Sequence, residues 1–127
     1  MNTKHRQIAI WTLVILVIVG GIVYGRYSQN QPGKYGPFAQ CLKESGATFY
    51  GAFWCPHCQT QKKMFGGAQK LLPYVECSTP DGQGQLDICK AKGIKGYPTW
   101  EFKDGSRETN VFSFEELSLK TNCSLPQ

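Results

Sequence analysis

One long apolar run dominates the N-terminal part of the chain. Ile8 to Tyr24 reads IAIWTLVILVIVGGIVY and holds no charged residue, which is typical of a membrane-spanning helix near the short end of the usual length range. Lys4 and Arg6 precede the run, and Trp11 and Tyr24 lie near its two ends, as basic and aromatic residues do at membrane interfaces. We therefore predict a cytoplasmic N-terminus over residues 1–7, a single-pass transmembrane signal-anchor over residues 8–25, and an extracytoplasmic remainder.

A cleaved secretion signal is the alternative interpretation of the same run. We prefer the uncleaved anchor because the run is long and Val23-Tyr24-Gly25 makes a poor cleavage site. Both interpretations send the following residues across the membrane. Residues 26–37 (RYSQNQPGKYGP) are rich in Gly, Pro, Asn and Gln, which predicts a short exposed tether.

Beyond the tether the apolar positions follow the periods of short helices and strands. Thr48 to Trp54 is a nearly continuous apolar run, as in a strand that is covered on both faces of its sheet. Lys103-Asp104-Gly105 is a hairpin turn signal, and Ser113 to Glu116 has the form of a capping box that opens a helix. In order, we expect a helix over Phe38–Ser45, a strand over Thr48–Trp54, a helix over Cys55–Phe65, a strand over Tyr74–Cys77, a helix over Gln85–Lys92, hairpin strands over Thr99–Phe102 and Glu108–Phe112, and a last helix from Ser113. This order predicts one α/β domain over residues 38–127.

The charge of the chain is concentrated around the apolar run. The formal net charge is +5, and Lys4, Arg6 and Arg26 supply three of these positive charges. The remaining basic and acidic residues nearly balance, and no basic stripe alternates with aromatic residues. The composition therefore gives no indication of a nucleic-acid partner.

The cysteines carry the candidate chemistry. Six cysteines in a chain of 127 residues are typical of an oxidising compartment. Cys55 and Cys58, separated by Pro56 and His57, lie where the expected strand turns into a helix. The helix N-terminus favours a thiolate, Pro56 fits the first turn, and a cationic His57 would stabilise a neighbouring thiolate further. The position predicts a redox-active pair in which Cys55 is the more acidic and more exposed thiol.

The same spacing is also half of many zinc sites. His57 is the one histidine of the expected domain, which makes a zinc site the weaker interpretation, and we expect no bound metal. Four further cysteines, Cys41, Cys77, Cys89 and Cys123, allow three pairings among themselves.

Residues in the second half of the chain favour redox chemistry. Gly96-Tyr97-Pro98-Thr99 leads into an alternating aromatic strand and resembles the cis-proline loop of the thioredoxin superfamily. Together with Tyr50–Cys58, Lys63–Gly66 and Tyr74–Cys77, this segment is similar to one subfamily, the thioredoxin-like domain that is fused to, or lies beside, membrane-embedded vitamin K epoxide reductase homologues in bacteria and plant plastids. The resemblance covers roughly residues 38–123.

The resemblance implies a thioredoxin-like fold, a mixed central sheet flanked by helices, here preceded by one transmembrane helix. It implies that Cys55 is the nucleophile and Cys58 the resolving thiol, with Pro56 and His57 tuning the pair. It also implies a cis Pro98, with Tyr97, Pro98 and Trp54 beside the substrate.

The resemblance further implies a structural disulfide between Cys77 and Cys89, which leaves Cys41 and Cys123 to pair with each other. The alternative for Cys77 and Cys89 is a second redox relay or a metal site. One departure concerns the acid that many thioredoxins bury six residues before the first active cysteine. That position is Phe49 here, and Glu76 is the nearby strand acid that could replace it.

The implied function is that of a membrane-anchored thiol–disulfide oxidoreductase. It would oxidise cysteine-containing exported proteins, hold no bound cofactor beyond the Cys55–Cys58 disulfide, and be reoxidised by a separate quinone reductase of the vitamin K epoxide reductase type. One alternative is a reductase or isomerase that receives electrons from a transmembrane thiol carrier. The other is a non-catalytic thioredoxin-like binding module.

Overall fold

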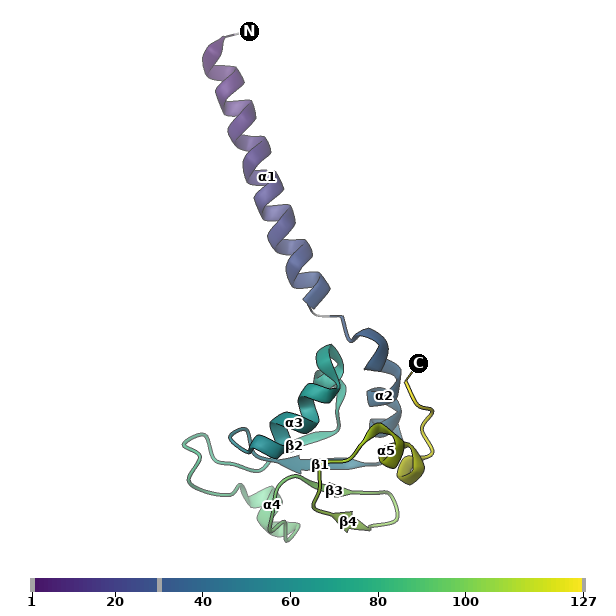
Figure 1. Ribbon diagram of the computed structural model, residues 1–127. Coiled ribbons are helices and arrows are strands. Elements are labelled where there is room, and N and C mark those ends of the chain that lie inside the picture. Colours follow the sequence, from purple (N-terminus) through teal and green to yellow (C-terminus); the bar gives the residue numbers. More distant parts are fainter. Residues whose placement is uncertain (1, 30, 127) are drawn as a thin grey trace. The chain divides into compact units, whose positions relative to one another are not determined.

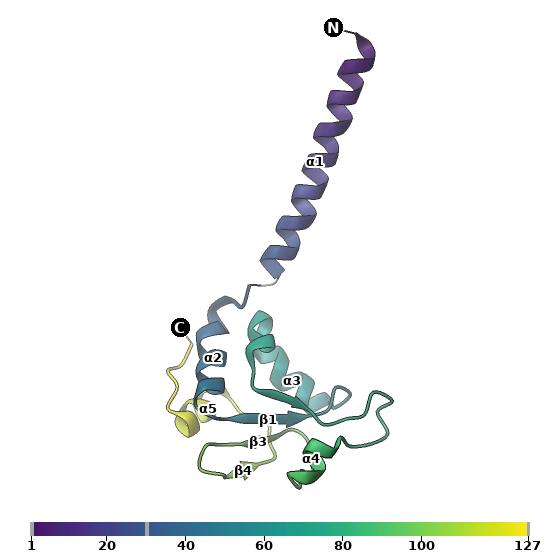
Figure 2. The same ribbon diagram turned by 180° about the vertical axis from the view of Figure 1, so that it is seen from behind.

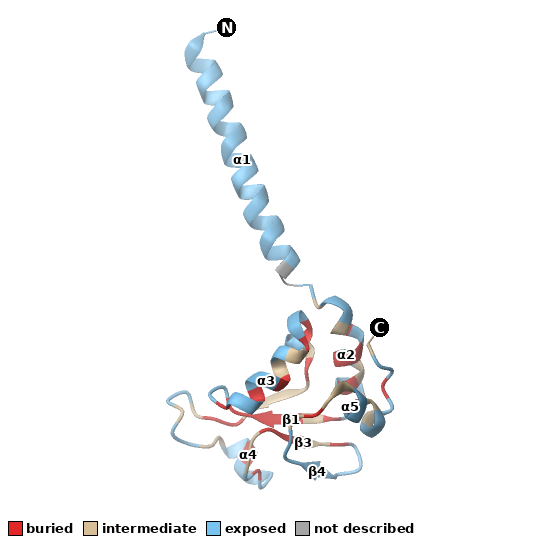
Figure 3. Ribbon diagram, viewed as in Figure 1, coloured by how far each residue is buried: buried red, intermediate tan, exposed pale blue. Residues whose placement is uncertain are grey.

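The computed structural model describes residues 2–29 and 31–126 in two compact units, Met1–Gln31 and Pro32–Gln127. The first unit is a single helix, α1, over Thr3–Gln29, and it is long and apolar enough to cross a membrane. Its large apolar residues are exposed, and Figure 3 colours the helix as exposed along its length. The helix continues beyond Gly25, so the first residues of the predicted tether are helical and not extended.

The second unit contains a four-stranded mixed sheet with the strand order β2-β1-β3-β4. Strand β1 pairs in parallel with β2 and antiparallel with β3, and β4 completes an antiparallel hairpin with β3. The elements in chain order are η1 (Gly33–Tyr35), α2 (Gly36–Glu44), β1 (Thr48–Gly51), α3 (Pro56–Met64), η2 (Gly66–Leu71), β2 (Tyr74–Glu76), α4 (Asp87–Ala91), β3 (Thr99–Glu101), β4 (Arg107–Glu108) and α5 (Phe114–Thr121).

Helices cover both faces of this sheet. Figures 1 and 2 view the unit from opposite sides, with α3 nearer the viewer in Figure 1 and α4 nearer in Figure 2. Consecutive residues of β1 point to opposite faces, so Phe49 joins the larger core cluster while Tyr50 joins a smaller one with Cys77, Cys89 and Ile94. The arrangement is the thioredoxin-like fold that the sequence predicts.

The larger core is built mainly from aromatic rings. Phe49 stacks on Trp100 with 4.8 Å between ring centroids, and Trp100 stacks in turn on Phe102. Phe38 and Phe65 stack on each other between α2 and the end of α3. The stacked rings join β1 to β3, and α2 to the C-terminal end of α3.

The hairpin differs from the prediction. The second strand ends at Glu108, whereas the apolar pattern predicts a strand through Phe112. The cause is Gln61 of α3, a fully buried residue whose side-chain amide donates to the Phe112 carbonyl at 3.1 Å and accepts from the Phe112 N–H at 2.8 Å. Because a side chain satisfies these backbone groups, residues 109–112 form a loop against α3 instead of a strand.

The turn and the cap near the C-terminus are confirmed. Gly105 has a φ of 82° in the hairpin turn, a conformation that costs glycine little. Ser113 and Glu116 form a complete capping box at the start of α5.

Two disulfides close the second unit. Cys41 of α2 is bonded to Cys123, which follows α5, with 5.9 Å between their Cα atoms and a sequence separation of 82. Cys77, directly after β2, is bonded to Cys89 of α4. Both Cys77 and Cys89 are fully buried, so this bridge is inaccessible to solvent, and the two pairings are those that the resemblance implies.

Candidate active site

Cys55 occupies the N-cap position of α3. Its backbone is extended, with φ −74° and ψ 119°, and its sulfur accepts a hydrogen bond from the Cys58 N–H at 3.5 Å. Pro56 follows in the first turn, where no N–H is needed. The sulfur therefore lies at the positive end of the helix dipole, among N–H groups that favour a thiolate.

Both thiols are buried, although Cys55 is the more exposed of the two, as predicted. The Cys55 residue is 4% exposed and Cys58 is fully buried. The Tyr97 carbonyl lies 3.7 Å from the Cys55 sulfur and accepts its S–H, so the loop before β3 lies against the Cys55 sulfur. A small exposed fraction still distinguishes Cys55 from Cys58.

The Cys58 thiol is weakly acidic. Burial, followed by the hydrogen bond with Cys55, raises the pKa of Cys58 from 9.0 to about 12, although a backbone hydrogen bond from Ala52 and the charge of Lys62 act in the opposite direction. At neutral pH Cys58 is therefore a protonated thiol.

A pocket of about 310 Å³ opens beside the pair. The Tyr97–Pro98 peptide bond is cis, as the sequence predicts, and both residues line the pocket together with His57. The opposite wall consists of Thr109, Asn110 and Val111, three residues that sequence reasoning did not place in the site. These three residues belong to the loop that Gln61 contacts through the Phe112 backbone. The apolar pattern predicts a strand there, and for this reason the sequence did not place them in the site.

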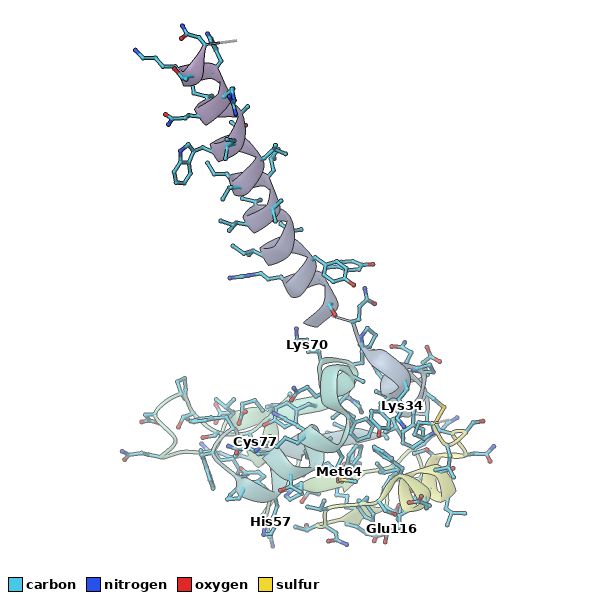
Figure 4. All side chains as sticks on the ribbon, turned by 45° about the horizontal axis from the view of Figure 1, so that its top comes forward. Lys34, His57, Met64, Lys70, Cys77 and Glu116 are labelled. Atoms are coloured by element: carbon cyan, nitrogen blue, oxygen red, sulfur yellow. A yellow bond between two sulfur atoms is a disulfide. The ribbon has the colours of Figure 1, made fainter. Side chains whose placement is uncertain are left out.

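His57 is exposed, and Figure 4 shows its side chain projecting outward from the domain. Among the residues that the structure describes, no hydrogen bond joins the His57 imidazole to either thiol. Trp54 lies on the other side of Cys55, about half exposed, and donates from Nε1 to the Ser78 hydroxyl at 2.8 Å. Its ring meets the Tyr97 ring edge-on at 6.1 Å, so Trp54 and Tyr97 together border the pair.

A second group of side chains lies on the β2 side of Cys58. The carboxylate of Glu76 accepts hydrogen bonds from the Tyr74 hydroxyl at 2.7 Å and from the backbone N–H groups of Phe53 and Ser78. The Lys62 ammonium sits 3.2 Å from the centroid of the Tyr74 ring. Sequence reasoning singled out Glu76 but not Lys62 or Tyr74. The available signal was that Lys62 comes four residues after Cys58 and so lies on the same helix face.

No family model matches the chain. The chain is similar to the thiol-disulfide oxidoreductase LTO1 of Arabidopsis thaliana, with 44% identity over 94 residues. The match covers 70% of this chain and 24% of that protein, so the chain spans about a quarter of the length of the relative. The larger part of the chain is thus similar to part of a thiol-disulfide oxidoreductase. The second unit has a thioredoxin-like fold and contains two free thiols.

Proposed function

We propose that this protein is a membrane-anchored thiol–disulfide oxidoreductase whose redox group is the Cys55–Cys58 pair. One observation carries the proposal. Among the described residues, which include all six cysteines, Cys55 and Cys58 are the two free thiols, and they lie at the N-terminus of α3 facing the cis Tyr97–Pro98 loop. The similarity to a protein named for the same chemistry supports it.

The reaction is a pair of thiol–disulfide exchanges. A substrate thiolate attacks the Cys55 sulfur of the oxidised pair, a mixed disulfide forms, and Cys58 leaves as a thiolate that takes up a proton. A second substrate thiolate then attacks the substrate sulfur of the mixed disulfide and releases the Cys55 thiolate. The substrate loses two electrons and gains a disulfide, while the pair is reduced to a dithiol.

We propose that the oxidising direction is the physiological one. The helix N-terminus at Cys55 supports it, because stabilising the thiolate of the reduced pair makes the disulfide a stronger oxidant. The clients would be cysteine-containing exported proteins. The apolar helix α1 supports a location at the membrane, where a quinone reductase of the vitamin K epoxide reductase type would reoxidise the pair. That partner rests on the resemblance of the domain's motifs.

A reductase or isomerase is the second candidate. The exposed position of His57 favours it, because the oxidising interpretation assigns part of the thiolate stabilisation to this imidazole. The free Cys55–Cys58 pair argues against a non-catalytic binding module.

Two measurements on the full chain in detergent test the proposal. The Cys58→Ser variant should accumulate a mixed disulfide with a client peptide whose cysteine is first converted to a disulfide with thionitrobenzoate, because the Cys55 thiolate attacks the peptide sulfur, thionitrobenzoate leaves, and no Cys58 thiol follows; the Cys55→Ser variant should not. The reduction potential of the pair, measured against glutathione, should lie above about −200 mV. A potential near about −270 mV, typical of reducing thioredoxins, would support the reductase. No mixed disulfide with either variant would refute thiol exchange at this pair.

A further inference from the structure

A Cys58 thiolate places a negative charge inside the domain, which is electrostatically unfavourable. Cys58 becomes a thiolate for a time whenever the Cys55–Cys58 bond breaks or forms, as the leaving group or as the attacking group, and this sulfur is fully buried. A buried anion is costly unless a compensating charge lies nearby. Phe49 cannot supply one, because it is apolar, fully buried and stacked on Trp100.

Gly51 opens a direct approach to Cys58 from the β2 side. A Cβ atom at Gly51 would lie 2.9 Å from the Cys58 sulfur and 2.8 Å from Cε2 of Tyr74. Both distances are too short for a real side chain, so glycine is what allows the thiol and the tyrosine ring to face each other. The Tyr74 ring thereby forms the boundary between Cys58 and the groups beyond it.

Those groups include a cation. The Lys62 ammonium packs on the Tyr74 ring at 3.2 Å from its centroid, a favourable cation–π contact. The Tyr74 hydroxyl is held by Glu76 at 2.7 Å, and Glu76 is fixed in turn by two backbone N–H donors. Lys62 is thus placed by two residues of the neighbouring strand and lies on the same helix face as Cys58.

We propose that Lys62, positioned by Tyr74 and Glu76, is the charge that stabilises the Cys58 thiolate during thiol–disulfide exchange. This inference rests on the proposed function. When Cys58 attacks the mixed disulfide on Cys55, the new Cys55–Cys58 bond forms, the bond to the other sulfur breaks, the other thiolate departs, and the Cys58 proton passes to solvent.

The signs of the surrounding charges agree with this role. The titratable groups around Cys58 are Cys55 from its own turn, Lys62 from the next turn, and Tyr74 and Glu76 from β2. Lys62 is the cation of this set, and its charge lowers the pKa of Cys58. Burial lowers the pKa of Lys62, while the charge of Glu76 raises it. Glu76 therefore helps to keep Lys62 protonated.

The two steps of the exchange can be observed separately in the reduced full chain in detergent. An aromatic disulfide reagent that releases coloured thionitrobenzoate reacts first with Cys55, and the attack of Cys58 on that mixed disulfide then releases a second equivalent. Lys62→Met should leave the first release unchanged. It should slow the second, because raising a thiol pKa by one unit lowers the thiolate fraction tenfold and raises its nucleophilicity about threefold, a net slowing of about threefold at neutral pH.

Three further variants test whether the charge of Lys62 causes the slower second release. Lys62→Arg keeps the charge and should restore most of the second rate. Lys63→Met removes the exposed neighbouring charge and should behave as wild type. Glu76→Gln should make the second rate rise less steeply at alkaline pH, because Lys62 then loses its proton earlier.

The outcomes distinguish this inference from the function on which it rests. A second release that is equally fast in Lys62→Met and wild type at every pH would overturn the role of Lys62 and leave the redox pair intact. Equal slowing in Lys62→Met and Lys62→Arg would also overturn it, because charge would then not be the cause. A wild-type protein that never releases the second equivalent would refute the redox pair itself.

Discussion

Replacing Gln61 with leucine tests whether one buried amide holds the wall of the pocket that His57, Tyr97 and Pro98 line. The Gln61 side chain is fully buried and bonds to both backbone groups of Phe112, the carbonyl and the N–H, while its amide nitrogen also donates to the Met64 sulfur at 3.6 Å. Leucine has a similar volume but no polar atoms. The Gln61→Leu variant therefore leaves two buried backbone groups without partners while it creates little empty space.

The expected cost follows from these two groups. A buried donor or acceptor that loses its partner costs about 1–3 kcal/mol, so the two together cost about 2–6 kcal/mol. Water that enters between α3 and the loop can satisfy part of the loss, which places the expected decrease in the free energy of unfolding near the lower end, about 2–3 kcal/mol. A domain of this size is stable by about 5–15 kcal/mol, so the variant should still fold.

Urea unfolding of the full chain in detergent, followed by tryptophan fluorescence, measures this difference. Gln69→Leu is the matched control, because Gln69 is exposed in η2, and it should change the free energy of unfolding by less than about 0.5 kcal/mol. The folded Gln61→Leu variant should also react more slowly with a client peptide, because residues 109–111 line the pocket. A decrease below 1 kcal/mol with unchanged peptide reactivity would refute the assignment of Gln61 as the residue that holds this loop.

Three further predictions concern the cysteines and their surroundings. Removing the Cys41–Cys123 bridge by the double serine variant should lower the free energy of unfolding by ~4 kcal/mol, since the bridge closes a loop of 82 residues; the potential of the active pair, measured in parallel, should stay unchanged. The reduced protein should lose stability as the pH rises above about 9, because the unfolded chain ionises Cys58 there whereas the folded chain keeps it protonated up to about 12; unfolding of the oxidised protein, in which Cys58 carries no proton, should show a smaller loss over the same pH range. His57→Ala should lower the reduction potential, but by no more than about 30 mV, the equivalent of 1.4 kcal/mol, because the exposed imidazole is screened by water; a larger change would show that His57 contacts the thiolate in solution.

The parts of the fold that local chemistry determines could be predicted from the sequence. The start of α3 at Cys55 and Pro56, the turn at Gly105 and the cap at Ser113 each depend on residues that are close together in the chain. The cis Pro98 followed instead from the resemblance of its loop to the thioredoxin superfamily, because few X–Pro bonds are cis on local grounds alone. The end of the hairpin could not be predicted, because it depends on Gln61, which lies about fifty residues earlier. The same applies to Lys62 and Tyr74, which meet across two elements. The burial of Cys55 also depends on a distant segment, the Tyr97 loop.

The two closed disulfides have a consequence for how the protein matures. Each newly made copy must lose two electrons at Cys41 and Cys123 and two more at Cys77 and Cys89 before its domain is complete. On the proposed function, a finished copy catalyses this very kind of oxidation, so finished copies can complete unfinished ones. Production of active protein would then be autocatalytic, with a lag that shortens as mature copies are added.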